Sequence, residues 1–479
     1  MTAGAGDAGA LPVPAQGPVV GTSASARDAS IGSGIRLAAE VVVRLSSIIA
    51  TLWLTRSLGV ATFGAFLLAL SIGLMMAELC DLGLNAIVVP LIVRSSRNLR
   101  TLFLMKAIMT AGVVMLSAVL IPIASQASGV APVLLALCTI HFLGASWIEM
   151  SGTTLRALGR RLDEALLLFV FRFTLVGLVI LAPFGMSVSG ASWAYAVAIG
   201  PAFIFGGLLL RSAGTPEPGP EGFDIRTILR QAAPLGVNGY LAIFSTRVEL
   251  FLLQAFQGEH FVGLFGGALR IVESLLTLPS AIAAGALPSV ARDVVRGSRG
   301  AAQRTFGLVV WIGVPSAVGL ALCAPGVLLV LGPGFVEGVV ALRILSLALF
   351  LCFANAALFH VLIASGETAI IPRLTGLRVG VAVVIGVLLV PTLGLVGASL
   401  SFTAAEMFLF GSLVRTTRPH AGLKVMRPVA FALLACVPMA SLLSIWSFSL
   451  PINILTGALL FVATAAAILR RGTEASGLA

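Results

Sequence analysis

Long apolar stretches, separated by short polar connections, fill almost the whole chain. From Ile35 to Leu469 each stretch holds about twenty residues, the length with which an α-helix crosses a hydrocarbon core of about 30 Å. We predict about fourteen spans, at 35–55, 62–92, 99–123, 130–151, 164–184, 188–210, 228–256, 261–290, 303–323, 339–363, 373–391, 394–414, 427–448 and 451–469. The pattern therefore predicts an all-α polytopic membrane protein without a sizeable soluble domain.

The composition supports this fold class. The chain is 58% hydrophobic and 10% charged, with a mean hydropathy of +1.09, whereas soluble domains hold about 25% charged residues. Five cysteines lie inside apolar stretches without a C-x-x-C pair, so we expect small buried side chains and neither a disulfide framework nor a metal site. We expect no cofactor.

The first 34 residues differ from the rest. They are rich in Ala, Gly, Ser and Pro, and they lack the basic start and short apolar core of a secretory signal. We predict a disordered cytoplasmic tail at 1–34.

The placement of the basic residues predicts the topology. The net charge is +11, and the arginines and lysines crowd every second connection, whereas Arg56 is the one basic residue of the connections between them. This is the positive-inside rule, which places both termini in the cytoplasm. The charge therefore reflects topology, and nucleic acid is not an expected partner.

The chain repeats itself after about 200 residues. "LGVATFGAFLLAL" (58–70) parallels "QGEHFVGLFGGAL" (257–269), "ALGR" (157–160) parallels "ASGE" (364–367), and "VSGASWAYA" (188–196) parallels "LVGASLSFT" (395–403). We predict two parallel six-helix lobes, because six spans return the chain to its starting side. The lobes would be 35–211 and 228–415, joined by a cytoplasmic linker at 212–227 and followed by two C-terminal helices and a cytoplasmic end in 416–479. Transporters built of such repeats bind their substrate between the halves.

A polar stripe follows the first span. Residues four apart share a helix face, and Arg36, Glu40 and Arg44 are continued on that face by Ser47 and Thr51. A charge at the bilayer centre costs at least about 2.5–3.5 kcal/mol, so such a stripe is typical of a helix that lines a cavity. Arg36 could instead extend to the nearby membrane surface.

The second half offers matching polar residues. Asn238 and Glu249 share one face of the seventh span, whereas Arg247 points nearly opposite and lines the same cavity only if the helix is irregular. Arg270 and Glu273 share a face of the eighth span. We predict that Arg44 and Arg270, one from each half, form a phosphate-binding site between the lobes, with four further candidate site residues: Arg36, Glu40, Asn238 and Arg247. The alternative is that these charges form ion pairs that only hold the bundle together.

Five carboxylates are candidates for coupling transport to H⁺ or Na⁺. They are Glu78, Asp81, Glu249, Glu273 and Glu406, and the sequence does not choose among them. Lys106, Arg172 and Arg378 lie near the cytoplasmic ends of their predicted spans, where we expect them to reach for the surface. We interpret His141 and His360 as core histidines.

Three segments carry a resemblance to a known family. "SLGVATFGAFLLALSIGLMMAELCDLGL" (57–84), "LGPGFVEGVVALRILSLALFLCFANAALFHVLIASGE" (331–367) and "VPTLGLVGASLSFTAAE" (390–406) resemble the polysaccharide-transport branch of the multidrug/oligosaccharidyl-lipid/polysaccharide (MOP) flippase superfamily. The resemblance implies a MATE/MurJ-like fold and a Wzx-type flippase for undecaprenyl-diphosphate-linked oligosaccharides.

The same resemblance implies a place in surface polysaccharide synthesis. Such flippases supply exopolysaccharide, O-antigen or capsule pathways, so a polysaccharide polymerase and export proteins are expected partners beside the lipid-linked substrate and the bilayer. Related lipid II flippases have functional arginines on their first, second and eighth helices. Arg44 and Arg270 match the first and the eighth by helix, but the second span here carries Glu78 and Asp81 instead.

Two other functions compete with this interpretation. A cation-coupled multidrug exporter of the same superfamily would share the fold, but we would expect acids and aromatics rather than arginines in its cavity. A membrane glycan polymerase or ligase would need a sizeable external loop, and the longest predicted one, 324–338, holds Glu337 as its single charge. With no HExxH or Walker A motif either, we do not expect an enzyme.

Overall fold

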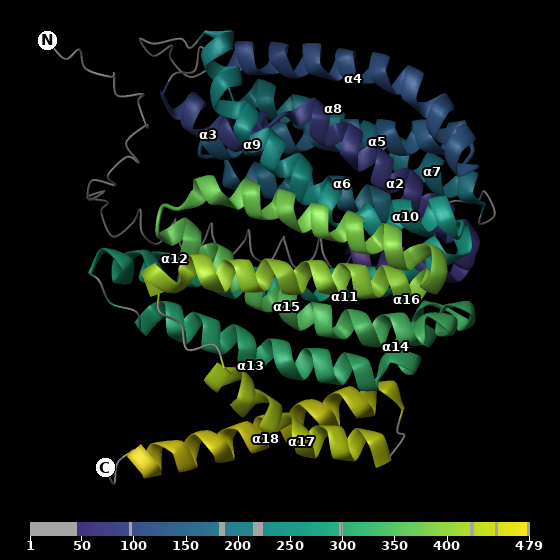
Figure 1. Cartoon of the computed structure of the whole chain (residues 1–479). Coiled ribbons are helices and arrows are strands. Elements are labelled where there is room, and N and C mark those ends of the chain that lie inside the picture. Colours follow the sequence, from purple (N-terminus) through teal and green to yellow (C-terminus); the bar gives the residue numbers. More distant parts are fainter. Residues whose placement is uncertain are drawn as a thin grey trace, which may run out of the picture.

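The computed structural model describes residues 46–94, 98–181, 187–213, 224–296, 298, 300–421, 426–445 and 449–476, and these residues form helices without a strand. The tail predicted at 1–34 lies outside the described residues. Figure 1 shows a bundle of nearly parallel helices in which the helices of residues 98–212 occupy the upper part and those of residues 300–364 the lower part.

The first half is built around one central helix, α5 (Pro132–Ala157). The half begins with a helix at 46–58, and α5 packs against each of the six other helices that follow it in this half. These are α2 (Val60–Asp81), α3 (Leu84–Arg94), α4 (Asn98–Ser128), α6 (Arg161–Leu181), α7 (Val188–Val197) and α8 (Ile199–Ser212).

The second half has α15 (Val339–Ala364) in the corresponding place. It packs against α11 (Glu259–Leu275), α12 (Thr277–Val295), α13 (Gly300–Leu322), α14 (Ala324–Leu331) and α16 (Ile371–Ala421). The half also includes α9 (Ile225–Ser245), α10 (Val248–Phe256) and two 3₁₀ turns, η1 (Pro333–Gly338) and η2 (Thr368–Ile370). The last helices, α17 (Met426–Ile445) and α18 (Leu450–Ser476), lie outside this half, where α17 packs on α13 (Figure 1).

Ten helices of the described residues are long and apolar enough to cross a membrane. The predicted spans outside that count have identifiable reasons. The seventh is broken between α9 and α10, the eleventh and twelfth form one 51-residue helix with a non-helical residue at Gly394, and the apolar part of the last is the shorter stretch Leu450–Ala465. Residues 35–45 of the first span lie outside the described residues.

The repeats predicted from the sequence adopt equivalent backbone conformations. Gly59 and Gly258 both have positive φ (73° and 88°) and directly precede α2 and α11. Gly159 and Gly366 also have positive φ (80° and 79°) and follow α5 and α15, the two central helices. These φ values favour glycine over residues with a Cβ. The same turns therefore begin and end equivalent helices in both halves.

Two close backbone contacts join the halves. At one end of α2, a Cβ added to Gly64 would lie 2.7 Å from the Gly263 nitrogen of α11, and one added to Gly263 would lie 2.8 Å from the Val60 carbonyl carbon. At the other end, the turn Leu82–Gly83 (φ 43° and 79°) lies against Gly236 of α9. Gly64 and Gly83 are about 28 Å apart along the helix axis at 1.5 Å per residue. The halves thus meet at both ends of α2.

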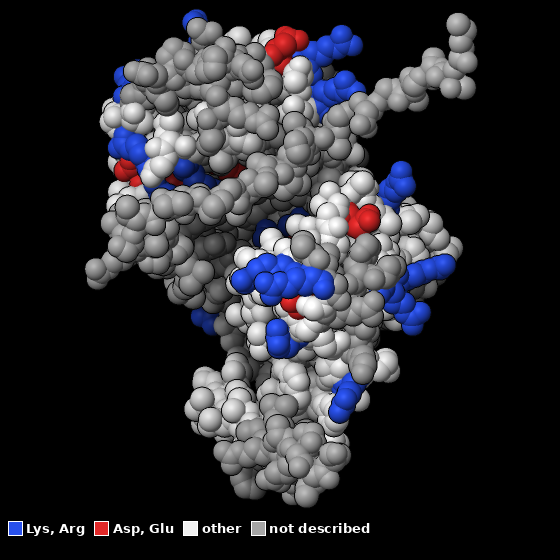
Figure 2. Space-filling view, turned by 90° about the vertical axis from the view of Figure 1, so that its left-hand side faces the viewer, with Lys and Arg blue, Asp and Glu red and all other residues white. Residues whose placement is uncertain are grey.

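One end of the bundle carries the basic connections. We call it the basic face; Arg160, Arg226, Arg292, Arg304 and Arg415 lie at helix ends that meet there. Figure 2 looks onto this face, where blue side chains gather, and shows a hollow between the upper and lower parts with basic atoms inside it. The Gly83–Gly236 contact lies toward the basic face, and the Gly64–Gly263 contact lies toward the opposite face.

Candidate functional site

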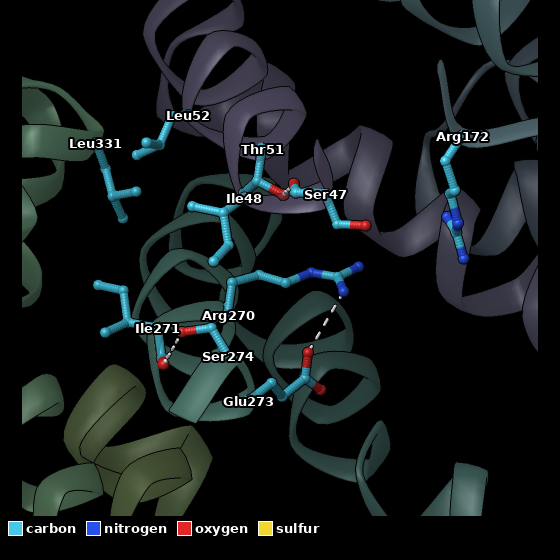
Figure 3. A pocket seen from close by; sticks show the side chains of 10 residues that line it. All are labelled: Ser47, Ile48, Thr51, Leu52, Arg172, Arg270, Ile271, Glu273, Ser274 and Leu331. Atoms are coloured by element: carbon cyan, nitrogen blue, oxygen red, sulfur yellow. Dashed lines mark hydrogen bonds and ion pairs between the residues drawn. The ribbon is translucent and has the colours of Figure 1, made fainter. Parts of the chain in front are cut away.

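A cavity of about 440 Å³ lies between the two halves. Helix 46–58 supplies its wall from the first half, together with Arg172 of α6, and α11 and α14 supply the wall from the second half (Figure 3). The lining residues are Ser47, Ile48, Thr51, Leu52, Arg172, Arg270, Ile271, Glu273, Ser274 and Leu331. The described part of the polar stripe predicted for the first span therefore faces this cavity.

A second cavity of about 240 Å³ adjoins the first. Both cavities are lined by Ser47, Thr51, Arg172 and Arg270. The second cavity is also lined by Arg247 and, on the side of α5 and α7, by the rings of His141 and Tyr195. Together they form one polar region, which we call the arginine cavity.

Among the described residues, three guanidinium groups and one carboxylate line the arginine cavity. The Arg247 Nη1 atom lies 3.0 Å from Glu273 Oε1, and the Arg270 Nη1 atom lies 3.4 Å from Glu273 Oε2. Figure 3 shows Arg270 extending between Glu273 and the helix that carries Ser47, while Arg172 enters from the far side. The guanidinium carbon of Arg172 lies 5.3 Å from the centre of the Phe171 ring. Three arginines against one glutamate give these lining residues a formal charge of +2, which suits an anionic ligand.

Arg247 reaches the arginine cavity because the seventh span is irregular. The amide groups of Thr246 and Arg247 donate to the carbonyl groups of Ile243 and Phe244, three residues back, so α9 ends in a tight turn at Ser245. The chain resumes as α10 at Val248. This break changes the helical phase, so that Arg247 faces the cavity and Glu249 does not line it.

The other predicted binding residues have different positions. Arg36, Glu40 and Arg44 lie outside the described residues. Asn238 is on α9 and is not among the residues that line the two cavities; its side-chain oxygen is buried without a hydrogen-bond partner in the described part of the chain.

Two of the candidate coupling carboxylates in the first half lie away from the arginine cavity. Asp81 accepts a hydrogen bond from the Lys106 ammonium group at 2.7 Å, and Lys106 also donates to Ser146 at 2.6 Å. Lys106 is fully buried, so the expectation that it reaches for the membrane surface is wrong. Glu78 lies beside Gly239 of α9, where a Cβ would clash with its carboxyl group.

A second buried ion pair stands in the second half. The Arg378 Nε atom donates to Glu406 Oε1 at 2.8 Å, and Asn355 donates to Glu406 Oε2 at 2.8 Å. Arg378 is 3% exposed, so for this residue too the expectation of a surface position is wrong. Arg172 lines the cavity instead of the surface as well. Its position eleven residues into a 21-residue helix is the signal that indicates mid-membrane depth.

His141 lies in an aromatic cluster. Its ring contacts Phe142, Phe171 and Tyr195, and its Nδ1 lies 2.8 Å from the Tyr195 carbonyl oxygen. His360 similarly bonds to the carbonyl of Ala356 within its own helix. The described residues hold no group of three or more His, Cys, Asp or Glu that is arranged to bind a metal ion.

Two helical halves that enclose a charged cavity at membrane depth define the class of multi-pass membrane transporters. A family model described as polysaccharide biosynthesis protein matches residues 32–292, more than half of the chain. The chain belongs to this family, a branch of the MOP flippase superfamily.

Solved structures share the fold. The lipid II flippase MurJ, in an inward closed conformation, aligns with a TM-score of 0.68 and 12% identity over 90% of this chain and 98% of its own. An inward-facing multidrug resistance MATE family transporter of the MOP superfamily aligns with a TM-score of 0.60 and 17% identity, over 81% and 95%. A MOP superfamily transporter from Pyrococcus furiosus, described by the reverse polarity of its binding pocket, aligns with a TM-score of 0.56 and 18% identity, over 84% and 94%. No curated protein matches the sequence. The MATE/MurJ-like fold expected from the sequence is thus confirmed.

Proposed function

We propose that the protein is a flippase for undecaprenyl-diphosphate-linked oligosaccharide repeat units. It moves them from the cytoplasmic to the periplasmic leaflet of a bacterial inner membrane, for the synthesis of a surface polysaccharide. The observation that carries the proposal is the arginine cavity between the halves, whose described lining residues set Arg172, Arg247 and Arg270 against the carboxylate of Glu273.

The charge of the cavity suits a diphosphate. A diphosphate that leaves water loses its hydration, and guanidinium groups replace that hydration with bidentate, charge-assisted hydrogen bonds. Glu273 holds Arg247 and Arg270 in place in the absence of ligand, and serine and threonine hydroxyls on helix 46–58 can bond to sugar hydroxyls. A volume of about 440 Å³ is within the range of ligand cavities, about 300–1,000 Å³.

The positive-inside rule makes the basic face the cytoplasmic side, with both termini there. The headgroup enters the arginine cavity from this side, while the polyprenyl chain remains in the bilayer. Entry requires the contact at Gly83 and Gly236, which is closed in this structure, to open. Rocking of the halves then closes this contact again and opens the one at Gly64 and Gly263, which exposes the headgroup to the periplasm. The polysaccharide polymerase and export proteins act on the delivered units and are the expected partners.

The comparisons support this function over its rivals. The family model is one of polysaccharide biosynthesis, and the lipid II flippase MurJ shares the fold. A multidrug exporter for cationic compounds would gain nothing from a cavity with a formal charge of +2. The proposal assigns the chain no enzymatic activity, because the described cavity residues bind and position a headgroup and offer no activated nucleophile.

The test is depletion of the protein in its native host, followed by measurement of lipid-linked oligosaccharide in each leaflet of the inner membrane. We expect accumulation in the cytoplasmic leaflet, restored by the wild-type protein and by Arg343→Ala, an exposed arginine outside the cavity, but not by Arg270→Ala. Repeat units that accumulate in the periplasmic leaflet would contradict the proposal in favour of polymerisation or ligation. New drug sensitivity without a glycolipid change would favour an exporter.

A further inference from the structure

Glu249 differs from three of the other candidate coupling carboxylates in having no ion pair, and from Glu78 in being fully buried. It lies on α10, is 0% exposed, and neither of its carboxyl oxygens has a hydrogen-bond partner among the described residues. In contrast, Asp81 is paired with Lys106, Glu406 with Arg378, and Glu273 with two arginines. An ionised carboxylate buried without a hydrogen-bond partner is strongly unfavourable, so this position favours the neutral, protonated form of Glu249.

The surroundings of Glu249 contain one cation and a second carboxylate. From α16, the helix that packs most closely on α10, the charged groups are Arg378 and Glu406. Ser401 of the same helix lies beside the carboxyl group, but its hydroxyl donates to the Ala382 carbonyl and so has no hydrogen left for a carboxylate. On α15, Cys352 and Asn355 face Arg378 and Glu406. On α11, Arg270 and Glu273 face the arginine cavity instead.

Two of the three guanidinium nitrogens of Arg378 donate hydrogen bonds to other groups. Nε donates to Glu406 Oε1 at 2.8 Å and Nη1 to the carbonyl oxygen of Ser245 at 2.6 Å, whereas Nη2 lies 2.7 Å from Glu406 Oε1 without a hydrogen bond among the described residues. Ser245 is the last residue of α9. The buried pair therefore anchors the α9–α10 break from the side opposite the arginine cavity.

The same break carries a residue of the cavity. Arg247 lies two residues before Glu249 and binds Glu273 at 3.0 Å. One side of the break is thus held by the proton-bearing cluster and the other by the ligand cavity. A change in the charge of Glu249 must alter the competition for Arg378, and with it the position of Ser245 and Arg247.

We propose that Glu249 is the proton-carrying group that drives transport, and that the α9–α10 break transmits its protonation state to Arg247. The inference rests on the proposed flippase function. Loss of the proton from the Glu249 carboxyl group to water leaves a carboxylate that attracts Arg378 away from the Ser245 carbonyl, which frees the break to move. The coupling ion is H⁺ rather than a metal ion, because the Arg378 guanidinium already provides the cation between the two carboxylates and would repel another.

The first experiment measures coupling in inverted inner-membrane vesicles of the native host, with the host's own lipid-linked oligosaccharide as the probe. For one proton per molecule, a pH difference of one unit shifts the steady-state leaflet ratio about tenfold. We expect this shift in the wild-type protein and in Glu337→Gln, an exposed carboxylate near His260, and no shift in Glu249→Gln. A tenfold shift in Glu249→Gln would overturn the proposal.

A second variant and a second measurement separate this inference from the proposed function. Glu249→Asp keeps a titratable group at a shifted position, so its response should remain with a changed pH midpoint; an unchanged midpoint would contradict the proposal. Infrared spectroscopy of the purified full-length protein needs no substrate. We expect a protonated-carboxyl band that is absent from Glu249→Gln and present in Glu337→Gln. If Glu249→Gln keeps every protonated-carboxyl band of the wild-type protein, the inference is overturned, even if the vesicles flip lipid.

Discussion

Glycine at position 263 lets the two halves meet on the face opposite the basic face, and Gly263→Val tests what this contact does. A Cβ at this position would lie 2.8 Å from the carbonyl carbon of Val60, and closer still to its oxygen. The clash is with backbone, so no side-chain rotation removes it. We expect the substitution to destabilise the conformation that is closed on this face and to leave the open conformation unaffected.

The magnitude follows from the geometry. Ordinary contacts of a Cβ begin at 3.4 Å, so α2 and α11 must separate by at least about 0.6 Å, and a valine needs more. Overpacking of this kind costs about 1–3 kcal/mol. A cost of about 2 kcal/mol paid by the closed state alone shifts the ratio of open to closed molecules about 30-fold, since about 1.4 kcal/mol corresponds to a factor of ten.

The assay is the reaction rate of Thr51→Cys, a position that lines the arginine cavity, with a membrane-impermeant thiol reagent. Gly263→Val should raise the rate for reagent added on the face opposite the basic face, and Gly236→Val should raise it for reagent added on the basic face. Gly112→Val is the matched control, because a Cβ there meets nothing within 4 Å. Equal rates for Gly263→Val and Gly112→Val would refute the role of this contact in closing the cavity.

Three further predictions concern buried and exposed charges. Lys106→Met leaves Asp81 buried without its partner, so the purified protein should lose about 3–5 kcal/mol of stability in thermal unfolding, and Asp81→Asn in the same chain should restore most of it. Arg172→Ala should weaken headgroup binding about 10- to 150-fold, the equivalent of one lost charge-assisted hydrogen bond of about 1.5–3 kcal/mol, at unchanged protein level in the leaflet assay. The backbone N–H of Ala301 lies 2.6 Å from the Asp293 carboxylate and lowers the pKa of Asp293. The stability that this hydrogen bond contributes is therefore present above the pKa of Asp293 in the unfolded chain and is lost as the pH falls through the lower pKa of the folded chain. Asp293→Asn should flatten the acid side of a profile of melting temperature against pH.

Much of the architecture could be predicted from the sequence because the relevant signals are local. The length of apolar stretches predicts spans, and the repeated Gly-x-x-x-x-Gly at 59–64 and 258–263 predicts equivalent turns, which the structure shows at Gly59 and Gly258. Arg270 and Glu273, three residues apart on one helix, do lie together in the cavity. All of these depend on residues close in sequence.

The partners of the membrane charges are a different matter, because they come from distant helices. Lys106 binds a carboxylate 25 residues away, and Arg378 binds one 28 residues away, so periodicity within a single helix gives no sign of either pair. Depth alone therefore suggested a surface position for both. Arg247 is an intermediate case. In a regular helix its side chain would point away from the cavity, and it lines the cavity because of the tight turn at Ser245. The sequence has no proline or glycine at that point to indicate the turn.

The distribution of charges in the described bundle separates structure from transport. Asp81 with Lys106 and Glu406 with Arg378 are buried pairs that cancel in charge, and breaking either removes stability without altering the charge of the cavity. The described residues that line the arginine cavity carry a formal charge of +2, which suits an anionic ligand. Glu249 stands between these two kinds of group, because it faces a neutral pair while the residue two positions earlier faces the cavity. In the proposed mechanism, a proton at Glu249 and a diphosphate at Arg247 would act on the same turn of backbone, which is the physical requirement for coupling one to the other.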